Sequence, residues 1–267
     1  MKESTDILVI DDEIVILDAI KKIASLIDLT SDTCLNVDEA LNNLNQKKYN
    51  LIICDIMMPD KDGFELLHII RQKRIQTPIV ITTGFSTLEN AVKALYEGAI
   101  GFIPKPFSVD ELTSIIKRGL EYGKIFTAQN SFTKSKNEDL LSFVPCPPKY
   151  YRLGYDSWMN KSREGTVLIG VTDLFLKLIG MIKEIDFMKP EETVYQGGTC
   201  LKIYDNNEFS HQVIAPISGK IIDINEKVIV NKSLLEKDPY FQGWIYRMIP
   251  ENLEHEINNI IPCSSDI

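Results

Sequence analysis

The sequence predicts a doubly wound α/β domain followed by a smaller, mostly β domain. Its 267 residues suggest about two domains, and 44% of them are apolar, which is enough to build hydrophobic cores. In residues 1–125, short continuous apolar runs alternate with helix-length amphipathic segments. This alternation is typical of strands that are buried on both faces of a parallel sheet. From Tyr150 onward, short apolar runs are separated by glycine and proline turns, which favours a sandwich or barrel.

Five strands are expected in the first domain, each followed by a helix. The expected strands, in chain order, are residues 7–10, 32–35, 51–54, 79–81 and 100–103. The second of these runs is the least apolar and is expected at an edge of the sheet. Between the runs, apolar residues recur at helical spacing, as in Ile14, Leu17 and Ile20. In such sheets ligands bind beyond the carboxyl ends of the strands, so the site is expected there.

The expected domain organisation has four parts. These are a first domain at residues 1–125, a linker at 126–148, a second domain at 149–252 and a C-terminal tail at 253–267. The linker is polar and aperiodic, and it ends in a proline-rich stretch where a helix cannot continue. The alternative, an extension of the preceding helix into a dimerising coil, stays open although no heptad repeat is visible. In the second domain we expect strands at residues 167–171, 200–204, 213–215 and 220–224, and one helix around 173–180.

Composition excludes several classes of function. The formal net charge is −9 and neither half is basic, so a nucleic-acid backbone would be repelled on average and no nucleic-acid partner is expected. No apolar stretch reaches the roughly 18 residues of a membrane helix. The N-terminus does not resemble a signal peptide, and we therefore expect a cytoplasmic protein. The five cysteines form no C-x-x-C pair and are expected to be reduced and mostly buried.

Polar side chains stand at the ends of four expected strands. Asp11 and Asp12 follow the first strand, Asp55 ends the third, Thr82 ends the fourth and Lys105 follows the fifth. Because these ends share one edge of a parallel sheet, the five side chains should converge. Three carboxylates held together repel one another unless a cation is present. A hard cation with oxygen ligands fits this set, and Mg²⁺ suits a site with few protein ligands.

This pocket suits phosphoryl transfer to a carboxylate. Asp55 is an oxygen nucleophile that can form an aspartyl phosphate. The Lys105 ammonium and the metal would neutralise charge on the phosphoryl oxygens, and the Thr82 hydroxyl can donate to one of them. The alternative is that these aspartates only cap helices or loops. One such residue would be weak evidence, but five at the ends of neighbouring strands favour a site.

Residues 6–122 resemble the receiver domain of two-component response regulators. The resemblance is carried by the Asp11-Asp12 pair, the Asp55-Ile-Met-Met-Pro-Asp-Lys-Asp-Gly segment, Thr82-Thr-Gly and Phe102-Ile-Pro-Lys-Pro. It implies a flavodoxin-like fold with five parallel strands in the order 2-1-3-4-5. It also implies phosphorylation of Asp55 by a histidine kinase or a phosphotransfer protein.

The same resemblance implies roles for individual residues. Asp12 and Asp55 would bind Mg²⁺, with Asp11 acting directly or through water and the Met57 carbonyl completing the set. Thr82 and Phe102 would form a switch pair, although a role for Phe102 in the core alone stays open. The Lys105–Pro106 peptide is expected to be cis. Thr83 replaces the small residue that is usual after the switch position, which puts the lifetime of the acyl phosphate in doubt.

Residues 150–250 resemble the H protein of the glycine cleavage system. The resemblance is carried by residues 165–172, 197–200, 214–221 and 238–245. It implies a lipoyl-type barrel-sandwich in which a lysine at a hairpin tip carries lipoate. In this chain Glu208 stands at that position, and a carboxylate cannot form the lipoyl amide. The nearest lysines, Lys202 and Lys220, fall on expected strands. We therefore expect no lipoate.

These features predict a phosphorelay response regulator that signals through a non-lipoylated H-protein-like interaction domain. It would not be an enzyme, apart from Mg²⁺-dependent self-phosphorylation and autodephosphorylation of the receiver. Its partners would be the phosphoryl donor and an unknown protein target, and a homodimer stays open. The alternative is a receiver-regulated lipoyl carrier of a glycine-cleavage-type complex that uses another lysine, such as Lys202. A transcription factor is disfavoured because no basic recognition helix is visible.

Overall fold

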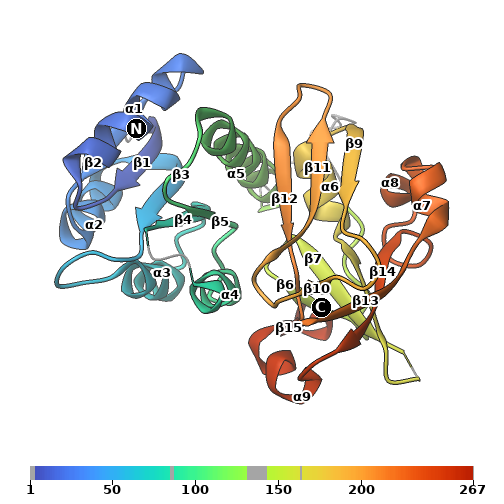
Figure 1. Cartoon of the computed structure of the whole chain (residues 1–267). Coiled ribbons are helices and arrows are strands. Elements are labelled where there is room, and N and C mark those ends of the chain that lie inside the picture. The colour runs from blue at the N-terminus through green and yellow to red at the C-terminus, as the bar shows by residue number, and fades with distance from the viewer. Residues whose placement is uncertain (1–3, 85–86, 131–142, 163, 267) are drawn as a thin grey trace. The chain divides into compact units, whose positions relative to one another are not determined.

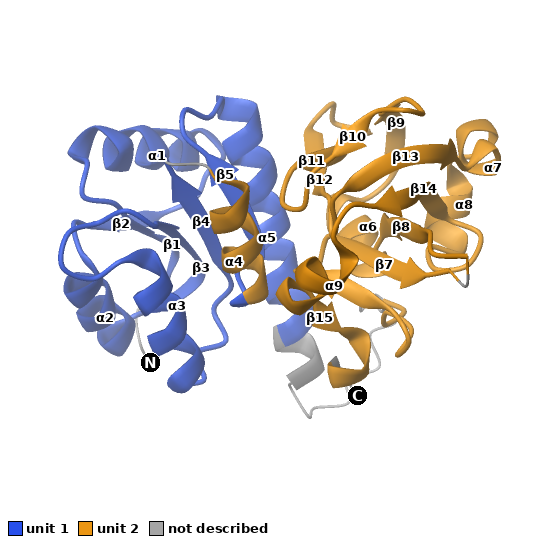
Figure 2. Ribbon diagram, turned by 60° about the horizontal axis from the view of Figure 1, so that its bottom comes forward, with its two compact units in different colours: residues 1–86, 97–140 blue, residues 87–96, 141–267 orange. Residues whose placement is uncertain are grey.

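The computed structural model describes residues 4–84, 87–130, 143–162 and 164–266 (Figure 1). Its contacts divide the chain into two compact units. The first unit comprises Met1–Ser86 and Glu97–Leu140, and the second comprises Thr87–Tyr96 and Leu141–Ile267 (Figure 2). A short segment near residue 90 therefore groups with the second unit, although it lies inside the expected first domain.

The first unit is built on a five-stranded parallel sheet. Its strands are β1 (Ser4–Ile10), β2 (Ser31–Cys34), β3 (Lys48–Asp55), β4 (Ile79–Thr83) and β5 (Gly101–Pro104). Their order in the sheet is β2-β1-β3-β4-β5, and neighbouring strands run parallel. The helices are α1 (Ile14–Leu26), α2 (Val37–Gln46), α3 (Gly63–Gln72) and α5 (Val109–Asn130). The doubly wound fold and strand order expected from the sequence are confirmed.

Local sequence explains where these elements begin and end. In β3 the last five residues are all buried, as expected for a central strand covered on both faces. The α3 helix begins with a capping box, in which the Asp62 carboxylate accepts from the Glu65 N–H and the Glu65 side chain accepts from the Asp62 N–H. The α5 helix continues to Asn130, beyond the boundary expected at residue 125. Most of the expected linker, residues 131–142, lies outside the described residues.

The second unit consists mainly of antiparallel strands. One sheet has the order β10-β13-β14-β8-β7-β6-β15, and a second has the order β12-β11-β9. The strands are β6 (Tyr151–Leu153), β7 (Ser157–Lys161), β8 (Val167–Val171), β9 (Ile182–Phe187), β10 (Thr193–Val194), β11 (Thr199–Asp205), β12 (Ser210–Ile214), β13 (Gly219–Ile224), β14 (Trp244–Pro250) and β15 (Ile261–Pro262). The helical segments are α4 (Leu88–Tyr96), α6 (Asp173–Ile179), α7 (Glu226–Val230), α8 (Ser233–Lys237), α9 (Leu253–Glu256), η1 (Ile257–Asn259) and η2 (Cys263–Asp266).

Buried apolar side chains hold the second unit together. Tyr246 and Phe175 belong to its large core, and Trp158 belongs to a smaller cluster with Tyr150 and Tyr240. The Trp158 indole N–H donates to the Val171 carbonyl at 3.0 Å, so this ring is buried without losing its hydrogen bond. The α6 helix, expected around residues 173–180, is capped by the Thr172 hydroxyl, which accepts from the Phe175 N–H. The mostly β fold class is confirmed.

The C-terminal segment is more ordered than a tail. Residues 253–267 were expected to follow the second domain, but β15 pairs with β6 in the seven-stranded sheet. In the same segment the Glu256 carboxylate accepts from both the backbone N–H and the hydroxyl of Ser218. The expected tail is therefore wrong as a structural description. The segment is polar and has no periodic pattern, so the sequence does not predict the two-residue strand β15. This strand is defined by its pairing with β6.

Removing the hydroxyl of Tyr246 should destabilise the second unit. This hydroxyl donates to the Cys200 carbonyl at 3.1 Å and accepts from the Met188 N–H at 2.8 Å. Tyr246→Phe leaves both groups without that partner, which should lower the free energy of unfolding by about 1–3 kcal/mol. Urea unfolding followed by tryptophan fluorescence reports on this unit, because Trp158 and Trp244 both lie in it. Tyr195→Phe is the matched control, since Tyr195 is 55% exposed, and an equal loss there would contradict the assignment.

Candidate functional site

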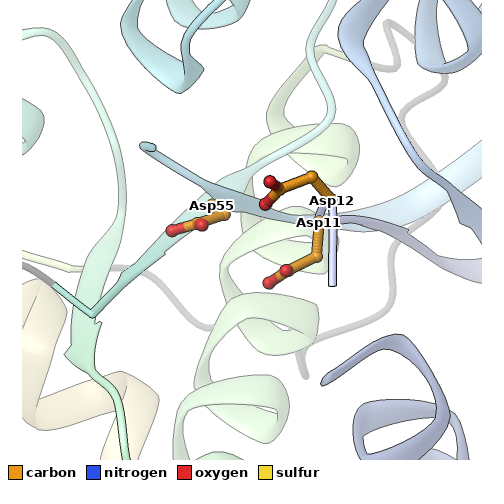
Figure 3. Close-up of side chains that lie close together, drawn as sticks. All are labelled: Asp11, Asp12 and Asp55. Atoms are coloured by element: carbon orange, nitrogen blue, oxygen red, sulfur yellow. The ribbon is translucent and has the colours of Figure 1, made fainter. Parts of the chain in front are cut away.

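The carboxyl edge of the first unit's sheet gathers the acidic side chains. Asp11 directly follows β1, Asp12 comes next and Asp55 is the last residue of β3. One carboxylate oxygen from each lies within 4.8 Å of the others. Figure 3 shows the three side chains side by side at the ends of these strands. Asp11 and Asp55 are buried, whereas Asp12 is exposed. The three aspartates therefore lie close together at this edge, as the sequence predicts.

Lys105 supplies positive charge to this cluster. It follows β5, and its ammonium lies 2.6 Å from Asp11 Oδ2 and 3.1 Å from Asp55 Oδ2. Its side chain is 8% exposed, so the charges meet where water screens them weakly. The Lys105–Pro106 peptide is cis, as the family resemblance implied.

Burial and charge act in opposite directions on these groups. Burial raises the pKa of the Asp55 and Asp11 carboxyls, and the Lys105 ammonium only partly offsets this rise. For Lys105, burial works against the charged form, but the hydrogen bond to Asp11 and the nearby carboxylates raise its pKa overall. The raised pKa keeps the Lys105 ammonium charged. Its single positive charge does not fully offset the effect of burial on the two carboxyls.

Two buried polar atoms at this edge have no partner among the described residues. They are Asp55 Oδ1 and Thr82 Oγ1. Asp55 and Thr82 pair in neighbouring strands, and the Ile56 N–H donates to the Thr82 carbonyl at 3.0 Å. Unsatisfied buried oxygens are costly and rare in a fold, so their presence beside three carboxylates points to a ligand. A divalent cation with oxygen ligands fits this donor set, and Asp11, Asp12 and Asp55 would hold it.

The other predicted residues lie close to this edge in the chain. Met57 is two residues beyond Asp55 and its side chain is exposed, while its carbonyl as a metal ligand stays a prediction. Phe102 lies in β5 and is partly buried. Its neighbour Ile103 is the residue that pairs with Thr82, so the two expected switch residues occupy adjacent strands one position apart. Thr83 is fully buried.

One residue of the site was missed by the sequence analysis. Glu13 donates its backbone N–H to Asp11 Oδ1 at 3.0 Å, and its carboxylate lies 3.8 Å from the Lys105 ammonium. This side chain is 63% exposed, so it adds a weak, solvent-screened charge to the edge of the pocket. Its position directly after the aspartate pair was the available signal.

In the second unit, the predicted lipoyl position lies in a hairpin loop. Strands β11 and β12 are antiparallel, and Glu208 lies in the turn between them with a positive φ of 67°. Its carboxylate lies 2.6 Å from the Lys183 ammonium, which comes from β9. Lys202 lies in β11 and Lys220 in β13, as expected. Lys183 therefore places an amine beside this turn, and no local pattern in the sequence pointed to it.

The first unit's fold and site define a class of protein. The first unit has a doubly wound parallel sheet. Its carboxyl edge carries clustered aspartates, a buried lysine and a threonine hydroxyl that has no partner among the described residues. Residues 7–117 match the response regulator receiver domain family, and residues 149–262 match the glycine cleavage H-protein family. The chain therefore belongs to the response regulators through its receiver domain, joined to a glycine cleavage H-protein domain.

Individual relatives agree with both matches. The chain is 30% identical to the DNA-binding transcriptional regulator NtrC of Salmonella typhimurium, over 54% of this chain and 31% of NtrC. It is 30% identical to glycine cleavage system H protein 2 of Aquifex aeolicus, over 42% of this chain and 69% of that protein. Among solved structures, the receiver domain of NtrX from Brucella abortus is 36% identical, covers 43% of this chain and 98% of its own, and has a TM-score of 0.42.

The receiver family match and the NtrC relatives support phosphorelay signalling by the receiver. The chain spans about a third or less of the length of the NtrC relatives, so the DNA-binding named in their descriptions belongs to those proteins. Receiver domains generally bind Mg²⁺ at an acidic site, and the aspartate cluster is such a site. Within the described part of the chain, no helix has the length and apolar content to span a membrane.

Mg²⁺ should stabilise the first unit through Asp12. A ligand that binds only the folded state at 100 times its dissociation constant adds about 2.7 kcal/mol to the free energy of unfolding. We expect Asp12→Asn to lose most of this gain, because it removes one carboxylate of the cluster. Asp18→Asn, an exposed aspartate on α1, is the control and should keep the gain. Urea unfolding followed by circular dichroism, with and without Mg²⁺, measures both, and equal gains in all three proteins would exclude Asp12 as a ligand.

Proposed function

We propose that this protein is a phosphorelay response regulator that accepts a phosphoryl group on Asp55 and signals through a non-lipoylated H-protein-like domain. The single observation that supports it best is the buried Asp55 carboxylate, whose Oδ1 has no partner among the described residues while its Oδ2 lies 3.1 Å from Lys105. One oxygen is thus left for bond formation and the other is held by a cation. The donor would be a histidine kinase or a phosphotransfer protein.

The transfer is a displacement at phosphorus. An Asp55 oxygen attacks, the new P–O bond forms, and the bond from phosphorus to the donor breaks so that its electron pair leaves with the donor group. Bound Mg²⁺ would neutralise negative charge on the phosphoryl group. Lys105 does the same from the chain, and its raised pKa keeps it charged for that task. Apart from this self-phosphorylation and the later hydrolysis, no enzymatic activity is proposed.

Thr82 would change its position when Asp55 is phosphorylated, and so alter the conformation of the receiver. Its buried hydroxyl lacks a partner among the described residues, and a phosphoryl oxygen on Asp55 would supply one. Because Asp55 and Thr82 pair across β3 and β4, a small shift of the threonine suffices. Phe102 would respond from β5, which lies next to β4. A phosphoryl group adds roughly one negative charge to the aspartate it modifies, which is enough to bias two conformations.

The H-protein-like domain would then act as an interaction module. The turn between β11 and β12 is present, but Glu208 stands where the resemblance places the lipoyl lysine. A carboxylate cannot attack an activated lipoyl group as an amine does. The side chain is 78% exposed, so it is displayed to partners rather than buried in the fold. The target of this domain would be another protein.

Phosphorylation should depend on Asp55 and on metal. With acetyl phosphate and Mg²⁺, the intact protein should gain one phosphoryl group, seen as a single mass shift, because Asp55 is the nucleophile. Asp55→Asn should gain none, and EDTA should prevent the gain in the wild type. Asp38→Asn, which changes an exposed aspartate on α2, is the control. Equal labelling of the Asp55→Asn protein would exclude the assignment.

The chain should remain free of lipoate. Protein made in cells supplied with lipoate should show the unmodified mass, because no lysine occupies the β11–β12 turn. Glu208→Lys places an amine there but faces Lys183, so the double variant Glu208→Lys with Lys183→Glu restores the charge pair and is the better acceptor. Lysine at position 202 is the internal control, since it lies within β11. A stoichiometric adduct on Lys183 or Lys202 of the wild type would favour the lipoyl-carrier alternative.

A further inference from the structure

A pocket of about 150 Å³ lies at the edge of the first unit's sheet that is opposite the aspartate cluster. It is lined by residues of α3 and α5, by the loop between α3 and β4, and by residues just before β5. Ile79, the first residue of β4, lines the pocket, whereas Thr82 lies near the other end of the same strand. All lining residues belong to the first unit, so that unit forms the pocket by itself.

Backbone hydrogen bonds hold the walls of this pocket in place. Just beyond the end of α3, the Ile75 N–H donates to the Ile70 carbonyl at 3.1 Å. Between them Arg74 has a positive φ of 53°, which is the arrangement of a Schellman motif. At the sheet, the Ile100 N–H donates to the Ile79 carbonyl at 2.8 Å. The pocket is therefore formed before any ligand binds, which lowers the cost of binding.

An aromatic pair and aliphatic side chains form the apolar part of the pocket. Tyr122 and Phe126 lie one turn apart on α5, and their stacked rings have centroids 4.3 Å apart. Both line the pocket, together with the aliphatic residues Leu67, Ile70, Ile79 and Ile100. Aromatic rings pair with other rings more strongly than their buried area alone provides. An apolar cavity of roughly 150 Å³ takes up a molecule the size of benzene, so this pocket has room for one ring.

One ion pair supplies polar groups to the same pocket. The Arg71 Nη1 lies 3.2 Å from Glu97 Oε2, and both residues line the pocket. A guanidinium has five N–H donors, and a carboxylate can accept several hydrogen bonds, so this contact leaves capacity on both groups. The two charges cancel, and a charged ligand is therefore attracted by one partner and repelled by the other. A neutral ligand with one hydroxyl or ring N–H can hydrogen-bond to Glu97 without that repulsion.

We propose that this pocket binds a small neutral aromatic molecule that carries one polar hydrogen, of the phenol or indole class. The ring lies among the aliphatic side chains and against the Tyr122–Phe126 pair, and its O–H or N–H donates to the Glu97 carboxylate. The pocket and the aspartate cluster lie at opposite edges of the sheet, so binding does not require Asp55. The first unit thereby has a small-molecule site in addition to its phosphoacceptor edge.

The test records methyl NMR spectra of the full chain, labelled at isoleucine, during a titration with phenol. Ile70 and Ile100 line the pocket, and a bound ring shifts their methyl signals through its ring current. Ile203, in the core of the second unit, is the internal control. Two other probes are titrated in the same way. Cyclohexanol has the size and hydroxyl of phenol but no aromatic ring, and benzoate has the ring with a negative charge.

We expect phenol to shift the Ile70 and Ile100 signals with a dissociation constant on the order of 1 mM, because one ring offers few contact atoms. The Ile203 signal should not move. Cyclohexanol should bind about fivefold more weakly, since it lacks the pairing with the aromatic rings. Benzoate should also bind more weakly than phenol, because Glu97 repels it. Glu97→Gln removes that charge, so this variant should bind benzoate at least about threefold more tightly than the wild type does.

Filling the pocket should prevent binding. Ile75→Phe adds a ring at a partly exposed position of the pocket wall, where it takes up the space that phenol needs. Leu44→Phe makes the same kind of change at a partly exposed residue outside this pocket, and it should bind phenol as the wild type does. Phe126→Leu is the second variant if Ile75→Phe does not fold. It should weaken phenol binding about fivefold and leave cyclohexanol binding unchanged.

Three results would overturn the proposal. One is a phenol titration that leaves the Ile70 and Ile100 signals of the wild type unmoved. Another is cyclohexanol binding as tightly as phenol. The third is phenol binding by Ile75→Phe, or by Phe126→Leu in its place, that equals binding by the wild type. Asp55→Asn should bind phenol normally, so a protein that takes no phosphoryl group but binds phenol contradicts only the function proposed above.

Discussion

The close approach of Asp11, Asp12 and Asp55 is the constraint around which the first unit is organised. Their oxygens lie within 4.8 Å of one another, and burial raises the pKa of two of these carboxyls. Lys105 offsets part of the repulsion through contacts of 2.6 Å and 3.1 Å. Such a cluster does not help the sheet to fold. It persists because β1, β3 and β5 run parallel and deliver their carboxyl ends to one edge. One lysine does not balance three carboxylates, so the edge keeps a net negative charge that favours a cation.

In the second unit, the β11–β12 turn does not depend on the Glu208 side chain for its hydrogen bonds. Glu208 and Lys183 are both largely solvent-exposed, and exposed ion pairs contribute little to stability. The turn itself is held by the Asp205 carboxylate, which accepts from the N–H groups of Asn207 and Phe209. At position 208 the backbone contributes as well, since the Glu208 N–H donates to the Asp205 carbonyl at 3.0 Å, whereas the Glu208 side chain pairs only with Lys183 among these contacts. By contrast, Trp158 and Tyr246 are fully buried, and substitutions there should lower the free energy of unfolding.

The α4 helix is assigned differently by family match and by contacts. By sequence it lies within residues 7–117, which match the receiver family. By contacts it belongs with Leu141–Ile267. Its buried residues are Ala91, Val92, Ala94 and Leu95, which are spaced along one side of the helix.

The sequence by itself determined the alternation of strands and helices in residues 1–125 and the positions of the polar residues at the strand ends, because continuous apolar runs and their end points are local features. It also determined that Glu208 cannot be acylated as a lysine is. Only the tertiary structure decided that β15 completes a sheet, that Lys183 faces Glu208 and that α4 packs in the second unit. None of these three features leaves a periodic signal in the sequence. They depend on contacts between residues that are far apart in the chain, and these contacts exist only once the chain has folded.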